Sequence, residues 1–369
     1  ITCDCGINDF KQIAYAKTIG LDVIVTDHHS PKKEKFPTEA IAVINPKLDK
    51  KFSEQELSGS AVALKLVQAL AETKWKDKSE AADFWQKFIE ISAIGVVADC
   101  VDLVGENRLI VQMGLQKMLQ TDWHGLSELL AADQNASQNI SAETIGFYIA
   151  PHLNAASRIG DRLLAAQLFL GNPKNSKKII EALQNLNKRR KILTKKGLDL
   201  AVLQIEETQN CQILFHESWP AGILGLIASR VCELTGKPTI ACSIKHDGTV
   251  GASCRSIEGV SIINALNEVN VSKALKYFGG HAGAAGFVCE SKNFEKVKTA
   301  LQTFFQTQNF PPKQFTPDAW IVPDLVDEEL ISFLDVLAPF GMQNAEPLFG
   351  FKNIFLSEKI PLGKSGEHF

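Results

Sequence analysis

Short apolar runs that alternate with helical patterns are the feature that most constrains the fold of this chain. In the first third, residues 1–3, 21–26 and 40–44 have the length and apolar content of buried strands, while residues 11–19 and 60–73 have helical apolar spacing. Strands that alternate with helices along a chain are typical of a parallel sheet covered by helices. We therefore expect a parallel α/β fold here.

The same alternation returns after residue 208. Apolar strand patterns and helical patterns follow one another there: strands at 211–215, 238–243 and 251–257, and helices at 223–234, 260–266 and 294–305. These patterns predict a second, smaller α/β domain. Beyond residue 309 three prolines mark a boundary, and 348–355 and 358–362 have the pattern of short β-strands.

One long helix is expected to join the two α/β regions, over residues 172–207. Between 174 and 196 it carries nine Lys or Arg residues and one acidic residue, Glu181. Such a charge run is consistent with a solvated linker helix. It is equally consistent with a helix that faces a nucleic-acid strand passing between domains, and the sequence leaves both alternatives open.

Composition narrows the class of protein. A chain of 369 residues is too long for a single core, and no apolar run approaches the roughly 18 residues that cross a bilayer. The N-terminus lacks the pattern of a signal peptide.

Cysteine spacing and net charge give two further expectations. The eight cysteines include no Cys-x-x-Cys pair, which predicts reduced thiols in a cytoplasmic protein. A net charge of −3 disfavours indiscriminate nucleic-acid binding but allows a local basic channel.

Carboxylates and imidazoles follow three apolar runs. Asp4, the triplet Asp27-His28-His29 and Asp99 each come directly after such a run. Because ligands gather beyond the carboxyl ends of parallel strands, three adjacent strands would bring Asp4, His28 and Asp99 to one point.

This combination of side chains favours hard divalent cations. Carboxylates mixed with imidazole suit Mn²⁺ or Mg²⁺ better than thiolates do. Two such ions about 3.5–4 Å apart can activate water and stabilise a leaving oxygen in phosphoryl chemistry. For any one of these residues alone a polar turn after a strand is the simpler explanation, but the three together predict a metal site.

Asp27-His28-His29 is the triplet that names the DHH phosphoesterase family, and two further places in the chain resemble that family. Asp4, ahead of Cys5-Gly6-Ile7, is similar to its second motif, and Asp99 in the segment GVVADCVDL is similar to its fourth. Pyrophosphatases, oligoribonucleases and RecJ exonucleases share these motifs. The motifs therefore indicate the superfamily and leave the substrate open.

Four later segments resemble the RecJ branch of that family. Residues 152–158 resemble an Asn-Ala-Ala-Gly-Arg segment with Ser157 in place of Gly, and residues 219–230 resemble Trp-His-x-Gly-Val-x-Gly-x-x-Ala-x-Arg with Pro220 in place of His. Residues 253–256 match a Ser-x-Arg-Ser turn. Residues 279–286 match the glycine-rich signature of the DHHA1 domain that accompanies the DHH domain.

The resemblance implies an architecture. It implies a parallel-sheet DHH domain, a connecting helix, a smaller α/β DHHA1 domain and the start of an OB-like β domain. The corresponding residues are 1–171, 172–208, 209–308 and 309–369.

The resemblance also implies a function. That function is single-stranded-DNA-specific 5′→3′ exonuclease activity by two-metal catalysis with Mn²⁺ or Mg²⁺, in DNA repair and recombination. The implied partners of such a monomer are single-stranded DNA with a 5′ end, a single-strand-binding protein and a helicase, with no membrane.

Site residues follow from the matched motifs. Asp4, His28 and Asp99 are expected to hold metal, while His29 faces the substrate phosphate and Asp27 orients its neighbours.

The resemblance also implies a 5′-phosphate pocket at the cleft between the domains, with Arg158 from the edge of the first domain and Ser253 and Arg255 from the second. Gly280 and His281 are expected to line the same cleft, nearer the scissile phosphate. The alternatives are salt bridges between domains for the two arginines, and a tight turn with a buried histidine for the glycines.

Two departures from the family pattern bear on activity. The Asp-x-Asp pair of the family's first motif is absent, and the third domain is cut off after residues 363–368. We therefore expect a fragment in which one metal position lacks ligands and activity is impaired. Two alternatives stay open: a DHH phosphodiesterase acting on short oligonucleotides or cyclic dinucleotides, and a DNA-binding or scaffold relative without catalysis.

Overall fold

Contacts within the chain divide it into two compact units. Unit 1 comprises Ile1–Gln120, Ile140–Ile145 and Gln314–Phe369, and unit 2 comprises Thr121–Asn139 and Gly146–Lys313. This computed structural model describes residues 1–52, 56–133, 139–245, 247–270, 273–308, 310, 316–355, 358 and 360. The domain boundaries inferred from the sequence remain a prediction, and each unit is described by itself below.

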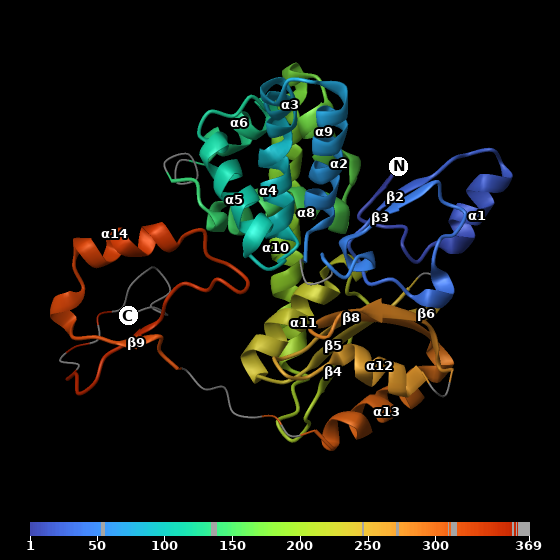
Figure 1. Cartoon of the computed structure of the whole chain (residues 1–369). Coiled ribbons are helices and arrows are strands. Elements are labelled where there is room, and N and C mark those ends of the chain that lie inside the picture. Colours follow the sequence, from blue (N-terminus) through green and yellow to red (C-terminus); the bar gives the residue numbers. More distant parts are fainter. Residues whose placement is uncertain are drawn as a thin grey trace. The chain divides into compact units, whose positions relative to one another are not determined.

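A three-stranded parallel sheet forms one part of unit 1 (Figure 1). Its order is β1 (Thr2–Cys3), β2 (Ile24–Thr26) and β3 (Ala42–Ile44), with α1 (Phe10–Thr18) connecting the first two strands. Val25 pairs in register with Thr2 on one side and Val43 on the other, and its side chain is fully buried. The expected parallel α/β fold is therefore confirmed.

Four helices follow the sheet in unit 1: α2 (Gly59–Lys74), α3 (Lys78–Trp85), α4 (Ile89–Ala98) and α5 (Gly105–Met118). Ser58 caps α2, because its hydroxyl accepts a hydrogen bond from the N–H of Ala61. Helices α2 and α4 approach closely at Gly95, where an added Cβ would lie 2.2 Å from the Ser60 hydroxyl. The Ser60 hydroxyl also donates to the carbonyl of Ser92, so this crossing fixes the end of α4 relative to the start of α2.

The placement of Asp99 after a strand is wrong. Residues 89–98 form helix α4, and Asp99 is its C-terminal cap residue. The segment is apolar on nearly every side, a pattern shared by a buried strand and by a helix that is buried all round. Contacts with α2 and α5 enclose α4, which explains why its sequence lacks a polar stripe.

The last described part of unit 1 contains β9 (Ala319–Trp320), α14 (Glu328–Leu337) and β10 (Phe349–Gly350), with β9 and β10 paired in parallel. The Arg108 guanidinium of α5 donates to the carbonyl of Leu337 at 2.7 Å. The strand expected over 348–355 is only two residues long. Of the strand expected over 358–362 the structure describes residues 358 and 360 alone, and neither is in a strand.

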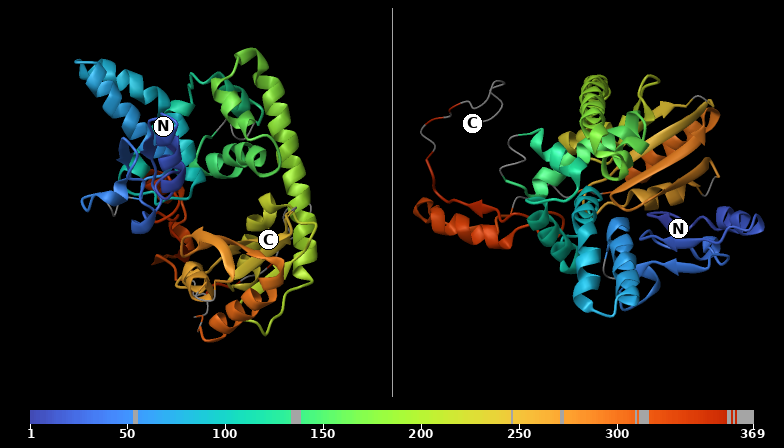
Figure 2. Two further views of the ribbon diagram at one scale, coloured as in Figure 1. Left: turned by 90° about the vertical axis from the view of Figure 1, so that its right-hand side faces the viewer. Right: turned by 90° about the horizontal axis from the view of Figure 1, so that it is seen from above.

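Unit 2 begins with helices around one long helix. These are α6 (His124–Ala131), α8 (Ala150–Ile159), α9 (Leu163–Leu170) and α10 (Ser176–Val202), the last of 27 residues (Figure 2). Of the nine basic residues between 174 and 196, all but Arg190 are exposed.

Short helical turns occur in both units. They are 3₁₀ turns at Lys33–Lys35, Pro46–Leu48, Gln86–Phe88, Pro173–Asn175, Ser291–Asn293 and Pro323–Leu325, and a π-helical turn at Thr144–Ile149.

A five-stranded mixed sheet forms the remainder of unit 2, in the order β4-β5-β6-β8-β7. Only β4 and β5 are parallel, and the other neighbouring pairs are antiparallel. The elements are β4 (Gln212–Phe215), α11 (Ala221–Thr235), β5 (Thr239–Ile244), β6 (Thr249–Arg255), α12 (Ile262–Asn270), β7 (Leu275–Gly280), β8 (Ala284–Glu290) and α13 (Phe294–Gln306).

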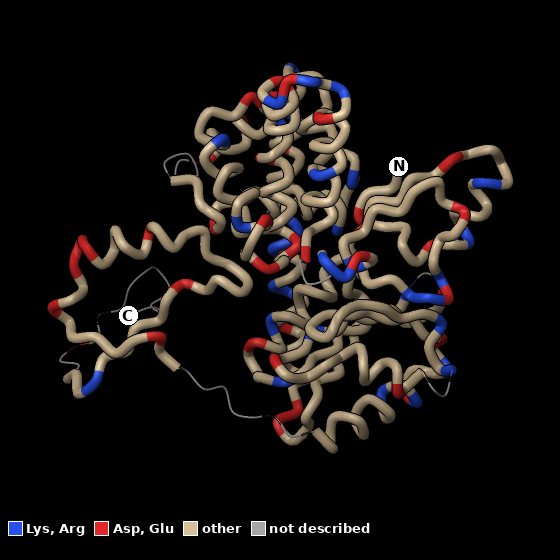
Figure 3. The backbone as a smooth tube through the Cα atoms, in the orientation of Figure 1, with Lys and Arg blue, Asp and Glu red and all other residues tan. Residues whose placement is uncertain are grey.

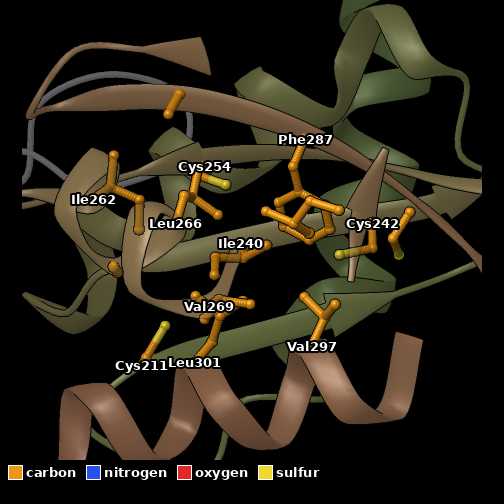
Figure 4. Packing of buried hydrophobic residues seen from close by; sticks show 14 of the residues in the cluster. Cys211, Ile240, Cys242, Cys254, Ile262, Leu266, Val269, Phe287, Val297 and Leu301 are labelled. Atoms are coloured by element: carbon orange, nitrogen blue, oxygen red, sulfur yellow. The ribbon is translucent and has the colours of Figure 1, made fainter. Parts of the chain in front are cut away.

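Two apolar cores lie on opposite faces of this sheet. One contains Ile240, Cys254 and Phe287 of the strands, packed against Leu266 of α12 and Leu301 of α13 (Figure 4). The other joins the β4–β5 half of the sheet to α11 and α10 and includes the buried ring of Trp219.

Five of the eight free cysteines are buried, and the remaining three, Cys3, Cys5 and Cys100, are exposed. Among the described residues, no helix combines the length and the apolar character needed to span a bilayer.

Candidate metal centre and arginine cluster

His28 lies between two carboxylates in unit 1. Its Nε2 atom is 3.1 Å from Oδ1 of Asp4 and 3.5 Å from Oδ2 of Asp99, and its side chain is only 13% exposed. The structure therefore brings together the three residues for which the sequence predicted a shared metal ion. Their role as ligands stays a prediction.

Three different local structures deliver these side chains. Asp4 follows β1, continues the ladder by donating its N–H to the carbonyl of Thr26, and has a left-handed φ of +61°. Aspartate is among the few residues that tolerate this conformation. His28 follows β2, and Asp99 ends helix α4. The end of strand β1 and the end of helix α4 thus bring Asp4 and Asp99 to His28, which lies at the end of strand β2.

Asp27 holds the loop that carries both histidines. Its side chain is 1% exposed, and Oδ1 accepts hydrogen bonds from the N–H groups of His28 and His29 and lies 2.7 Å from Nδ1 of the His29 ring. Oδ2 accepts from the N–H of Ile7, in the loop after β1. Burial acts to raise the pKa of this carboxyl, but the hydrogen bonds outweigh it and hold the pKa well below its ordinary value.

His29 differs from His28 in its electrostatic setting. The hydrogen bond to Asp27 raises the pKa of His29, burial opposes this, and the charges of Asp27, Asp4 and Asp99 add to the rise. Ligand atoms of Asp4, His28 and His29 lie within 4.8 Å of one another. The geometry is thus compatible with His29 either as a ligand or, as predicted, facing a substrate phosphate.

A divalent cation fits this group of side chains. In its neutral form the His28 ring carries one N–H and can donate it from Nε2 to only one of the two carboxylates that face it. Asp4 and Asp99 carry like charges, so their convergence is favourable with a positive centre between them. Oxygen and imidazole donors are the set that Mn²⁺ and Mg²⁺ accept.

Gly59 belongs to this site, although no pattern in the sequence marks it as functional. A Cβ atom on Gly59 would lie 2.4 Å from Oδ1 of Asp4, which real atoms do not reach. Glycine at the first position of α2 therefore lets the helix start directly against the carboxylate. The helical apolar spacing of residues 60–73 predicted the helix but not its neighbour.

Three guanidinium groups gather in unit 2. Burial lowers the pKa of Arg158, and the charges of Arg190 and Arg255 lower it further, which places both guanidinium groups within electrostatic range of Arg158. Arg158 donates to the carbonyl of Gly222, and Arg255 to that of Cys254. Among the described residues no carboxylate forms an ion pair with any of the three arginines, so their charge is available to an anion.

The elements that carry this arginine cluster were predicted only in part. Arg158 lies in the last turn of helix α8, in a segment for which the sequence patterns predicted no helix. Ser253 and Arg255 lie in strand β6, within the strand expected over 251–257, so the assignment of 253–256 to a turn was wrong. A four-residue motif does not show that a strand continues through it. Arg190, held by two hydrogen bonds to Oδ1 of Asn187, was missed because it lies within a long run of basic residues.

Helix α11 explains how two of these arginines meet. At Gly222 a Cβ atom would lie 2.0 Å from the backbone oxygen of Arg158, and at Gly225 one would lie 3.0 Å from a guanidinium nitrogen of Arg255 and 3.1 Å from the Ser253 hydroxyl. The two glycines are three residues apart and so lie on one face of the helix. Their spacing lets α8 and β6 both pack against that face.

Gly280 and His281 lie at the hairpin between β7 and β8. Gly280 has a φ of +139°, and a Cβ there would lie 2.4 Å from the backbone oxygen of Ala284. Glycine is therefore required at position 280, because the two strands approach each other closely there. His281 is exposed and donates its N–H to the carbonyl of Ala284. A part in binding substrate remains a prediction for both residues, and the buried histidine of the alternative is not found.

Three family models match the chain in sequence order. They are the DHH family, N-terminal domain, at residues 1–96, the DHHA1 domain at residues 200–307 and the RecJ OB domain at residues 317–369. The chain is 31% identical to the single-stranded-DNA-specific exonuclease RecJ of Bacillus subtilis over all of its own length and 46% of that protein. It is 30% identical to the Escherichia coli RecJ over 95% of its length and 64% of that protein.

A solved structure agrees with these matches. The crystal structure of RecJ from Thermus thermophilus in complex with Mn²⁺ superposes with a TM-score of 0.85 at 29% identity, covering 95% of this chain and 51% of that one. The chain therefore belongs to the DHH family. Within it, the chain is a RecJ-like protein, and it spans about half the length of the first of the curated relatives it matches.

Replacing Asp27 by Asn should lower the pKa of His29. The substitution removes the negative charge and the charge-assisted hydrogen bond that raise this pKa, so His29 should lose its proton at a lower pH than in the parent protein. An NMR titration of the metal-free protein measures the shift. Asp22→Asn, which removes the exposed partner of Lys17, is the matched control and should leave His29 unchanged. Equal His29 titrations in Asp27→Asn and the parent would contradict the assignment.

Proposed function

We propose that this protein is a metal-dependent exonuclease that degrades single-stranded DNA from a 5′ end. The observation that carries the proposal is the convergence of Asp4 and Asp99 on His28, in a chain that is similar over its length to proteins named single-stranded-DNA-specific exonuclease. A related structure contains Mn²⁺ and another contains Mg²⁺, and the donor set here suits either ion.

Each residue of the metal centre has a part in this proposal. Asp4, His28 and Asp99 hold metal, and His29, oriented by Asp27, donates a hydrogen bond to an oxygen of the scissile phosphate. A pair of bound ions would supply an activated water and stabilisation of the leaving oxygen. The raised pKa of His29 supports this donor role, because a protonated imidazole donates from both nitrogens.

The arginine cluster supports recognition of a 5′ phosphate. A terminal phosphate carries close to two negative charges near neutral pH and needs several fixed donors. Arg158, Arg255 and Ser253 supply such donors, and Arg190 adds a third guanidinium.

The DNA strand beyond the terminal nucleotide needs a basic path. A groove of about 420 Å³ lined by residues of α10 and α11 offers the positive charge of Arg190, Lys191 and Lys195 for that strand, while Arg230 in the same lining is paired with Glu233. Acidic and basic positions are interspersed elsewhere on the backbone (Figure 3). Local charge of this kind explains how a chain with net charge −3 could bind DNA.

The biological setting is part of the proposal. We place the protein in DNA repair and recombination, as a cytoplasmic monomer that acts with a single-strand-binding protein and a helicase. The 27-residue helix α10 and the match to the RecJ OB domain favour a polynucleotide over a short oligonucleotide or cyclic dinucleotide as substrate.

Activity should depend on an Asp-x-Asp strand. A chain extended at its N-terminus by a strand that carries the family's Asp-x-Asp pair should release mononucleotides from 5′-phosphorylated single-stranded DNA in Mn²⁺. The 369 residues alone should be nearly inactive, because two-metal catalysis needs both ions in place. Product sizes on gels with 3′-labelled DNA measure both rate and polarity.

Two outcomes would contradict this account. Robust degradation by the 369 residues alone would refute the need for the added strand. An extended chain that binds Mn²⁺ and is folded, but releases no nucleotide, would refute the exonuclease assignment. His28→Ala in the extended chain is the control for contaminating nuclease and should abolish the product.

Arg255→Ala should remove the preference for phosphorylated over hydroxyl 5′ ends. Losing one charge-assisted contact costs about 1.5–3 kcal/mol, which is tenfold or more in affinity. Fluorescence anisotropy with metal-free protein and matched oligonucleotides measures the preference. Arg162→Ala removes an exposed arginine of the same unit and should leave the preference intact. An unchanged preference in both Arg158→Ala and Arg255→Ala would refute the phosphate pocket.

A further inference from the structure

One face of the unit 2 sheet is only partly covered by helix. Leu214 of β4 and Ala241 of β5 pack beneath α11, and the same row of paired residues continues through Ser253, Gly286 and Gly279. Above this second half of the row lies a cavity of about 270 Å³. Ala221 and Leu224, at the start of α11, form one side of it.

Glycines form the floor of this cavity. Gly251, Gly286 and Gly279 lie on three neighbouring strands and face the same side of the sheet. A Cβ on Gly279 would meet no atom within 4 Å, so the floor there is open and its peptide planes are accessible. We call this cavity the glycine-floored pocket. Gly286 and Gly279 are direct cross-strand partners and leave a strip of the floor without side chains, beside Ser253 and Val288, whose side chains face the same side. Such a strip suits a planar ligand.

An aromatic ring and a cation form the opposite side. Tyr277, which pairs in register with Val288, is 62% exposed although it lies in a strand. The Lys245 side chain crosses over Gly251, where a Cβ would lie 2.6 Å from its Cε atom, and its ammonium lies 5.8 Å from the centre of the Tyr277 ring. The pocket thus presents a ring for stacking and a positive charge beside it.

The pocket is continuous with the arginine cluster. Ser253 lines the pocket, and its hydroxyl accepts a hydrogen bond from Arg255, two residues further along β6. By the register of β6, β8 and β7, Tyr277 lies two strands across and two residues along from Ser253, which is about 12 Å between Cα atoms. A nucleotide whose phosphate is held at Ser253 and Arg255 can span this gap together with the Tyr277 side chain.

We propose that the glycine-floored pocket binds the base of the 5′-terminal nucleotide, stacked on Tyr277, while the arginine cluster holds its phosphate. This inference rests on the proposed function and adds a base-binding subsite to it. The volume is slightly below the roughly 300–1,000 Å³ of pockets for drug-sized ligands, which suits a single base.

The chemistry of the pocket indicates recognition without sequence preference. Stacking on an aromatic ring tolerates every base, because each has a π-face. The side chains that line the pocket offer the hydroxyls of Ser253 and Tyr277 and the Lys245 ammonium as hydrogen-bonding groups, and Ser253 already contacts Arg255. The subsite should therefore distinguish a base from no base, and one base from another only weakly.

Binding of oligonucleotides with and without a terminal base tests the subsite. We compare 5′-phosphorylated single strands whose first residue is either intact or abasic, by anisotropy with the metal-free 369-residue chain. The intact strand should bind about five- to 150-fold more tightly, which corresponds to stacking of about 1–3 kcal/mol. Tyr277→Ala should bring this ratio close to one and keep the preference for a 5′ phosphate.

Two further variants separate stacking from loss of structure. Tyr277→Phe keeps the ring and should keep the ratio. Phe147→Ala removes an aromatic ring that is 81% exposed elsewhere in the unit and should also keep it. Because Tyr277 is exposed, its replacement leaves the core of the sheet intact, and the unfolding midpoint of each variant verifies this.

The outcomes distinguish this inference from the proposed function. Equal affinity of the parent protein for intact and abasic strands, or a ratio unchanged in Tyr277→Ala, overturns the base subsite while the 5′-phosphate preference persists. A parent protein that binds no single-stranded DNA, or ignores the 5′ phosphate, overturns the proposed function and the subsite with it.

Discussion

The buried carboxylate of Asp27 is the interaction on which the metal centre depends. It accepts hydrogen bonds from three backbone N–H groups and contacts the His29 ring, and so it ties the loop after β2 to the loop after β1. A buried charge is tolerated only when its hydrogen bonds are satisfied. Because Asp27 is satisfied in this way, the loops that carry His28 and Asp4 keep fixed positions.

Close packing at glycines has the same positioning role in both units. Gly59 admits the start of α2 against Asp4, and Gly95 lets α4 approach α2 so that Asp99 reaches His28. In unit 2, Gly222 and Gly225 let α11 contact the segments that carry Arg158 and Arg255. Any side chain at these positions would displace a functional group, so the placement of charge depends on the absence of Cβ atoms.

The spacing of apolar residues predicted much of the fold, because apolar side chains recur every second residue in a half-buried strand and every three to four residues in an amphipathic helix. It failed at α4, since an apolar run enclosed by α2 and α5 has no polar face to reveal a helix. The motifs gave Asp4, His28 and Asp99 as one group, and the structure brings them together. Gly59, Arg190 and Tyr277 could not be found this way, because their importance comes from neighbours distant in sequence that no local pattern encodes.

The central claim is that Asp4, His28 and Asp99 form one cation site. Isothermal titration of Mn²⁺ into the metal-free chain, compared with Asp4→Asn, Asp99→Asn and the exposed control Asp22→Asn, tests it most directly. Loss of a ligand should weaken binding by more than the 10–100-fold that follows from disturbing a ligand's hydrogen-bond partner. Asp22→Asn should bind as the parent does. Mn²⁺ affinity that is unchanged in both Asp4→Asn and Asp99→Asn would contradict the account.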